Sequence, residues 1–307
     1  MVRWAPRISV LSLPWNGRPY QFQIWGPKSG PRRSAQSVFP EFELLRSPKG
    51  VRNERFRLAD DTEWSHIYPA IPDSDIQDFM SLDDDGLAAR CGNLALVKVL
   101  LKWSVPMNNA PNFHGVTPLA QAATGGHKAI FDLLLQTSSG DVNKPDNNGD
   151  NPLARAAEEG HALIVQTLLQ QDGILADPRN IFGETPLALA AERGHTDVVK
   201  LLLQHPDVEI DSSDREGCTP LARAAAMGHA DIVRMLADHS EVNINSKDCD
   251  GYSPMAWAAR RGHCAVIREL MGHVEIDSES KDEDGFTPLM IALDEGNSDV
   301  IRAICEA

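Results

Sequence analysis

The stretch GETPLALAAERGHTDVVKLLLQHPDVEIDSSDREG, residues 183–217, contains one complete copy of a unit that recurs along most of this chain. Thr185 is a good helix N-cap, and Pro186 suits the first helical position, where its missing N–H is not needed. Gly194 follows this first helix, as glycine commonly does at a helix end. A second helix then follows, and its apolar face is predicted to contain Val198, Val199, Leu201, Leu202 and Leu203.

The glycine that opens the unit returns every 34 residues, and each time a Thr, Ser or Asn followed by Pro stands two residues later. These glycines are Gly115, Gly149, Gly183, Gly217, Gly251 and Gly285. One unit cannot bury its own apolar face, so the copies must stack. Self-similarity at this period therefore predicts an all-α solenoid of helix-turn-helix units with projecting β-turns or hairpins.

We count seven copies within residues 83–307. The first is degenerate, because Asp83-Asp84-Asp85 replaces Thr-Pro-Leu, and the last is truncated, because the chain stops within its second helix. Atypical terminal copies are expected, since they cap the stack.

The unit resembles the ankyrin repeat, and the resemblance covers about residues 83–307. Two departures stand out. The family period is usually one residue shorter, so these copies look like long-loop arrays of fungal proteins. The histidine that usually follows Thr-Pro-Leu is also missing. Its positions hold Ala120, Ala154, Ala188, Ala222, Ala256 and Met290.

The resemblance implies that partners bind at the turn tips and the inner face of the first helices. In the fifth to seventh copies these positions hold residue types that dominate interface hot spots. The predicted partner-binding set, on the concave surface, is Arg223, Met227, Tyr252, Trp257, Arg260, Arg261 and Phe286. The alternative is that Trp257 and Phe286 pack against neighbouring copies, as aromatic side chains often do.

The charge is unevenly distributed. The chain carries a net charge of -15, although residues 1–58 hold eleven Lys/Arg and only three Asp/Glu. An acidic body repels phosphate backbones, which argues against nucleic acid as the main partner. The five cysteines include no CxxC pair, which indicates reduced thiols in an intracellular protein, cytoplasmic or nuclear. No apolar run approaches the roughly 20 residues of a membrane span.

Residues 1–58 form a basic, aromatic segment in which we find no persistent helical or strand period, and low order is predicted. It could be a disordered arm that binds an acidic partner, an organelle-targeting segment, or a start without a folded role. Residues 59–82 are predicted to cap the array, with a short helix over residues 73–82.

A set of five histidines also recurs at the repeat period. Successive copies stack roughly 10 Å apart, whereas Zn–N bonds are about 2 Å long. We therefore expect no metal or cofactor, and the resemblance implies that the rings bond to backbone at the turn. One recruited ligand is the alternative. The histidines are His127, His161, His195, His229 and His263.

No phosphate loop, nucleophile elbow or HExxH motif is present, and Cys91, Cys218 or Cys264 would need a neighbouring base to act as a nucleophile. The favoured hypothesis is a monomeric, non-catalytic protein–protein interaction module, acting as adaptor, scaffold or inhibitor. One alternative is an enzyme or small-molecule binder with a pocket in the concave groove. Another is the repeat portion of a larger signalling protein.

Overall fold

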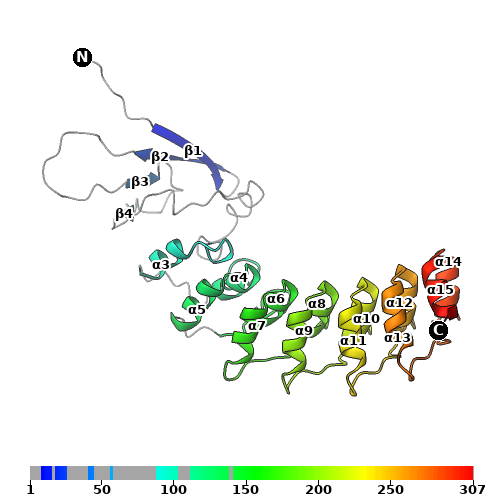
Figure 1. Ribbon diagram of the computed structural model, residues 1–307. Coiled ribbons are helices and arrows are strands. Elements are labelled where there is room, and N and C mark those ends of the chain that lie inside the picture. Colours follow the sequence, from blue (N-terminus) through cyan, green and yellow to red (C-terminus); the bar gives the residue numbers. More distant parts are fainter. Residues whose placement is uncertain are drawn as a thin grey trace, which may run out of the picture. The chain divides into compact units, whose positions relative to one another are not determined.

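The computed structural model describes residues 8–15, 18–25, 41–44, 56–57, 88–102, 111–137 and 141–306. The chain divides into two compact units, residues 1–84 and 85–307, each of which is described by itself (Figure 1). The expected capping segment at residues 59–82, with its short helix, lies outside the described residues.

The first unit contains a four-stranded antiparallel sheet in the order β1-β2-β3-β4. Its strands are β1 (Ile8–Trp15), β2 (Arg18–Trp25), β3 (Glu41–Leu44) and β4 (Phe56–Arg57). The sequence predicted low order for residues 1–58, the segment in which the structure describes these four strands. Trp15 pairs with Arg18, so Asn16-Gly17 separates β1 from β2. That dipeptide between apolar runs is a strong hairpin signal, and prolines within both runs obscured it.

The second unit is the predicted solenoid, in which the second to seventh copies each supply a pair of short helices and the first copy supplies α3 within the described residues (Figure 1). The first helices are α4 (Pro118–Thr124), α6 (Pro152–Glu158), α8 (Pro186–Arg193), α10 (Pro220–Met227), α12 (Pro254–Arg261) and α14 (Pro288–Asp294). The second helices are α3 (Leu94–Lys102), α5 (Lys128–Thr137), α7 (Ala162–Leu169), α9 (Thr196–Leu203), α11 (Ala230–Ala237), α13 (Cys264–Met271) and α15 (Ser298–Glu306). First helices pack on first helices of the next copy, and second helices on second helices.

The helix boundaries follow the predicted capping chemistry. The Thr185 hydroxyl accepts the Ala188 N–H at 3.3 Å, and Pro186 occupies the first turn of α8. Gly194 closes α8 in the left-handed region, with φ of 81°, where a side chain would be strained. The equivalent residues that cap the other first helices are Thr117, Asn151, Thr219, Ser253 and Thr287.

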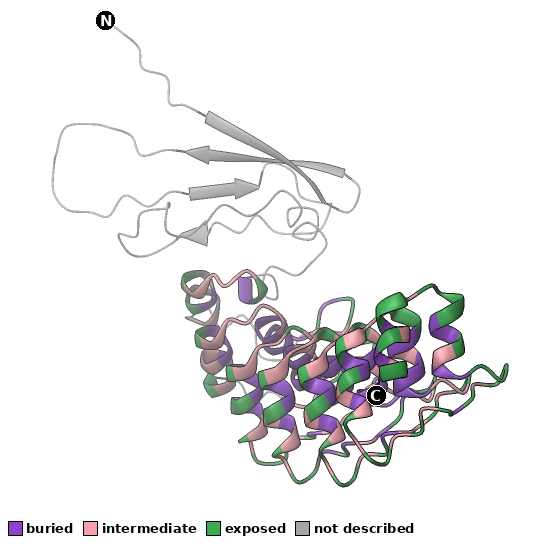
Figure 2. Cartoon of the chain, turned by 45° about the vertical axis from the view of Figure 1, so that its right-hand side comes forward, coloured by how far each residue is buried: buried purple, intermediate pink, exposed green. Residues whose placement is uncertain are grey.

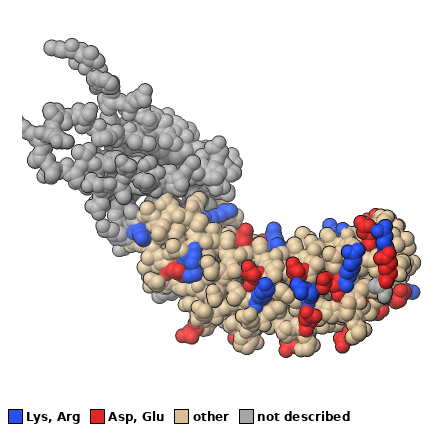
Figure 3. All heavy atoms as spheres, in the orientation of Figure 1, with Lys and Arg blue, Asp and Glu red and all other residues tan. Residues whose placement is uncertain are grey.

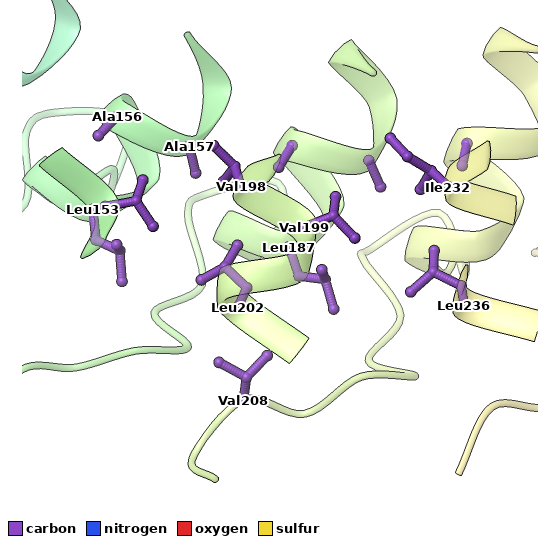
Figure 4. Packing of buried hydrophobic residues seen from close by; sticks show 14 of the residues in the cluster. Leu153, Ala156, Ala157, Leu187, Val198, Val199, Leu202, Val208, Ile232 and Leu236 are labelled. Carbon is purple, nitrogen blue, oxygen red and sulfur yellow. The ribbon is translucent and has the colours of Figure 1, made fainter. Parts of the chain in front are cut away.

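The core runs the length of the array, between the helices of successive copies (Figures 2 and 4). Leu187 of α8 and Val199 and Leu202 of α9 are completely buried. Alanines on the first helices let neighbouring helices approach closely. Leu201 and Leu203, which were expected in the same buried face, are only half-buried because they flank it.

The loops end in tight turns. The Gly217 N–H bonds to Asp214 O at 3.1 Å, and the Asp214 N–H bonds to Cys218 O at 3.0 Å. The turns of neighbouring copies are also hydrogen-bonded to each other, because the Arg215 N–H donates to Phe182 O of the preceding turn at 2.9 Å. The predicted projecting β-turns are confirmed, and residues 88–102, 111–137 and 141–306 contain no β-strand.

Candidate binding surface

The turn of the sixth copy positions the predicted tryptophan. Asp248 Oδ1 accepts the N–H groups of Asp250 at 3.0 Å and Tyr252 at 2.8 Å, which closes the turn. Its second oxygen, Oδ2, accepts the indole N–H of Trp257 at 2.7 Å. A single carboxylate thus fixes the turn and also the ring of a residue on α12.

The structure brings together four of the seven predicted residues, Tyr252, Trp257, Arg260 and Arg261, which we call the aromatic–arginine cluster. The two rings lie 5.1 Å apart with an interplanar angle of 36°. The Arg260 guanidinium carbon lies 5.3 Å from the Tyr252 ring and 5.7 Å from the Trp257 ring. The Arg261 guanidinium carbon lies 6.0 Å from the Trp257 ring. At such distances each cation–π contact contributes about 0.5–1 kcal/mol when exposed.

The cluster is open to solvent at its arginines. Both arginines are exposed, whereas Tyr252 and Trp257 are half-buried. Arg260 also approaches Glu295 at 3.8 Å, a loose and exposed ion pair. Among the residues that the structure describes, no carboxylate lies within ion-pairing distance of Arg261. The Arg261 guanidinium therefore keeps its N–H donors available.

Arg223 lies in a different environment from the cluster. It donates to Asp214 Oδ2 from Nη2 at 2.6 Å and from Nε at 3.0 Å, and its Nη1 donates to Glu192 at 3.2 Å. Glu184 lies 3.4 Å away. Burial opposes its charged form and lowers the pKa of Arg223, but the Asp214 hydrogen bond together with the negative charges of Asp214 and Glu192 outweighs burial, so the pKa of Arg223 is raised. Its charge is thus neutralised within the protein.

Met227 and Phe286 stand at the remaining predicted positions. Met227 ends α10 with 51% of its surface exposed, and Phe286 lies in the turn before α14 with 41% exposed. Phe286 is therefore not a core residue. Trp257 is half-buried, so it is neither a fully buried core residue nor a fully exposed one.

Ion pairs that were not predicted from the sequence link a turn to the first helix that follows it. Arg155 donates from Nε to Asp146 Oδ2 at 3.0 Å, in the same way that Arg223 bonds Asp214. The available signal was an Asp nine residues before an Arg, at matching positions of two copies. Figure 3 shows the resulting pattern, in which basic and acidic side chains lie side by side along the array.

The recurring histidines bond to backbone, as the resemblance implied. The Nε2 atom of each ring lies 2.8–3.0 Å from a carbonyl oxygen near the end of the preceding first helix. The accepting residues are Arg90, Thr124, Glu158, Glu192 and Ala226. Within the described part of the chain, no three metal-ligating side chains gather at one point.

Cys218 is a poor candidate for a nucleophile. Burial, followed by the negative charge of Asp214, raises the pKa of its thiol to about 12. A thiol with that pKa stays protonated at neutral pH, whereas thiolate is the reactive form. The catalytic alternative gains no support at this residue.

The repeated helix pairs, caps and turn ladders match a known family. A family model for ankyrin repeats, which describes three copies, matches residues 86–180, 172–248 and 239–307. The chain belongs to the ankyrin repeat family. Ankyrin repeat domains are typically protein–protein interaction modules. None of the helices that the structure describes is long and apolar enough to cross a membrane.

Two solved ankyrin repeat structures resemble this chain. The domain of human ASB11 is 27% identical, covers 73% of this chain and 97% of its own, and has a TM-score of 0.66. The domain of Bcl-3, described as a unique member of the IkappaB protein family, is 26% identical. It covers 73% of this chain and 98% of its own, with a TM-score of 0.59. A comparison with curated proteins gives no match.

Proposed function

We propose that this ankyrin array is a non-catalytic binding module, acting as an adaptor, scaffold or inhibitor. Its partner is another protein, which contacts the aromatic–arginine cluster on the concave side of the first helices, together with Met227 and Phe286. The observation that carries the proposal is the ring of Trp257, which is partly open to solvent and held in place by Asp248.

The cluster has the physical properties of an interface anchor. Trp257 has its only polar donor satisfied and its ring packed at a tilt against Tyr252, so a partner would find it already ordered. Binding to a preorganised side chain avoids the loss of about 0.5–1.5 kcal/mol of rotamer freedom. Arg261 adds guanidinium donors that no described carboxylate occupies, and these can bind a partner carboxylate or backbone carbonyl.

The other predicted residues contribute to the proposed binding surface in different ways. Met227 and Phe286 provide exposed apolar area on either side of the cluster in sequence. Arg223 supports the surface through internal ion pairs and offers less to a partner. We infer a monomer that works inside the cell, in cytoplasm or nucleus, without a cofactor.

The test compares two charge reversals of the whole chain. Arg261→Glu alters the cluster, whereas Arg268→Glu alters an exposed residue of α13, in the other row of helices. Each immobilised protein is exposed to lysate of the source organism, and captured proteins are identified by mass spectrometry. A protein bound by wild type and Arg268→Glu but lost with Arg261→Glu, and then bound directly after purification, supports the proposal. Equal capture by all three overturns it.

A further inference from the structure

A polar side chain after each second helix bridges to the next copy. The position recurs at the repeat period, and in four successive loops it holds Asn143, Asp177, Asp211 and Asn245. The loops that follow α7, α9 and α11 have the same backbone turn, which is closed by an equivalent hydrogen bond in each. One example is the bond from the Val208 N–H to His205 O at 3.3 Å. The four positions are thus structurally equivalent, but the outer two hold an amide and the inner two a carboxylic acid.

The asparagines make two bonds each. Asn143 donates from Nδ2 to Gly173 O at 2.8 Å, and its Oδ1 accepts the Leu175 N–H at 2.8 Å. Asn245 repeats this geometry one hundred and two residues later in the chain. Its Nδ2 donates to Glu275 O at 2.7 Å, and its Oδ1 accepts the Asp277 N–H at 2.8 Å. Each amide therefore satisfies a donor and an acceptor of the next copy.

The aspartates make only the accepting half of this bridge. Asp211 Oδ2 accepts the Asn243 N–H at 3.0 Å, and the carboxyl of Asp177 accepts the Glu209 N–H. In both residues the other oxygen, Oδ1, is buried and has no hydrogen-bond partner. That oxygen corresponds to the Nδ2 of the asparagines, whose acceptor is the carbonyl of the residue thirty positions later. An ionised carboxylate cannot donate to that carbonyl, but a protonated one can.

The charged groups around the two carboxyls differ. Burial raises the pKa of Asp177 to about 6, Arg179 and the Glu209 N–H oppose this rise, and the charge of Glu209 adds to it. Arg179 is itself paired with Glu209 at 3.1 Å. Burial also raises the pKa of Asp211. The hydrogen bond from the Asn243 N–H opposes this rise, and the negative charge of Glu209 adds to it.

We propose that Asp177 and Asp211 are protonation-dependent clamps between neighbouring copies. In the neutral form each carboxyl donates its O–H to the carbonyl at the position equivalent to the asparagines' acceptor, that of Asp207 or Glu241, and completes the two-bond bridge that Asn143 and Asn245 make at any pH. The proton comes from solvent and returns to it when the pH rises. Mild acid thereby tightens the loops that join the third copy to the fifth.

The sign of the pH dependence follows from linkage. An Asp in the unfolded chain has a pKa of about 3.9, below that of folded Asp177. The folded protein therefore binds more protons between these values, and the stability that this group contributes is present below pH of about 4 and falls as the pH rises through about 6. This is opposite to the usual behaviour of a salt-bridged Asp.

The experiment measures the urea midpoint of the full chain at pH 7.5 and pH 5 for wild type and Asp177→Asn. The amide supplies the missing donor, so we expect a higher midpoint than wild type at pH 7.5 and a smaller difference at pH 5. The matched reverse variant, Asn143→Asp, should show a lower midpoint at pH 7.5 that recovers at pH 5. Asp172→Asn removes an exposed charge nearby and controls for net charge.

The proposal is overturned if Asp177→Asn has the wild-type midpoint at pH 7.5, or if its gain is the same at both pH values or matches that of Asp172→Asn. A direct titration of the Asp177 carboxyl carbon by NMR gives an independent answer, even if Asn143→Asp does not fold. A midpoint well above 4 supports the clamp, and a midpoint near 4 contradicts it.

Discussion

Trp257 donates its indole N–H to Oδ2 of Asp248, nine residues earlier, just as Arg223 donates to Oδ2 of Asp214 in the copy before. In both copies the other carboxylate oxygen closes the turn, so one Asp connects a turn tip to the first helix that follows. The copy whose turn holds Asn180 in place of an Asp lacks this link between turn and first helix. Leu189 offers no donor there, and the Asn180 amide instead bonds to Asp150 at 3.1 Å. The hydrogen-bond partner of the turn side chain thus differs with the residue that stands on the first helix.

This arrangement predicts that Trp257→Phe and Trp257→Ala separate stability from binding. Phe keeps a ring for a partner but leaves Asp248 Oδ2 with only the weak Cys218 thiol donor at 3.8 Å, which costs about 1–2 kcal/mol. Ala removes the ring as well, and with it the tilted ring contact with Tyr252. We expect urea unfolding to show a modest loss for Phe, while partner capture persists. Loss of capture by both variants despite a wild-type helical signal would show that binding needs the Trp257–Asp248 bond and not the ring alone.

Arg223→Met should destabilise the array more than Arg193→Met. Arg223 balances Asp214, whose side chain is 1% exposed, together with Glu192. Removing it leaves a buried carboxylate without its charged donor, which costs about 2 kcal/mol. Arg193 is 56% exposed and makes one ion pair, with Glu158. Exposed pairs contribute about 0–1 kcal/mol. The difference in unfolding free energy between the two variants measures the internal role of Arg223, and equal losses would contradict it.

The sequence predicted the repeated parts of the structure because each copy restates the same local chemistry. Thr185 and Gly194 carry enough information to place the two ends of α8, and the periodic leucines and valines identify which faces meet. The candidate binding surface was harder to predict from the sequence. Trp257 and Arg223 occupy the same position of the unit, and only the partners around them show that one belongs to a surface cluster and the other to an internal ion-pair network.

Contacts between copies were hardest to anticipate. Asn143 and Asp177 are polar loop residues in the sequence, and nothing local indicates that their side chains reach the following copy. In residues 1–58, by contrast, the signal was present. Asn16-Gly17 favours a hairpin on local grounds, but the alternation around it is interrupted by Pro14 and Pro19.

The glycines that end the first helices provide another test. Gly228 has φ of +83°, and a Cβ there would lie 2.7 Å from the His263 ring. Gly296 has φ of +73° but nothing within 4 Å of the added atom. Ala at either position adopts a left-handed conformation that costs about 1–2 kcal/mol. Gly228→Ala should therefore lower the thermal midpoint further than Gly296→Ala, because only it displaces a histidine. Comparable losses would mean that backbone strain accounts for both.

The position of the recurring histidines holds an asparagine, Asn297, in the last copy. His229 Nε2 donates to Glu192 O at 2.9 Å. In the last copy Asn297 Nδ2 makes the equivalent bond to Arg260 O at 3.2 Å and also donates to the adjacent Ala259 O at 2.8 Å. An amide therefore fits this site without a ring. We expect His229→Ala to lose about 1 kcal/mol of unfolding free energy, the net contribution of one hydrogen bond, plus the packing of the ring.

His229→Asn should recover the hydrogen-bonding part, so its urea midpoint should lie between those of wild type and His229→Ala. Because the amide does not titrate, the recovery should be the same at pH 5 and pH 8. If His229→Asn is as unstable as His229→Ala at both values, packing of the ring against Gly194, and not the bond to the Glu192 carbonyl, holds the two copies together at this turn.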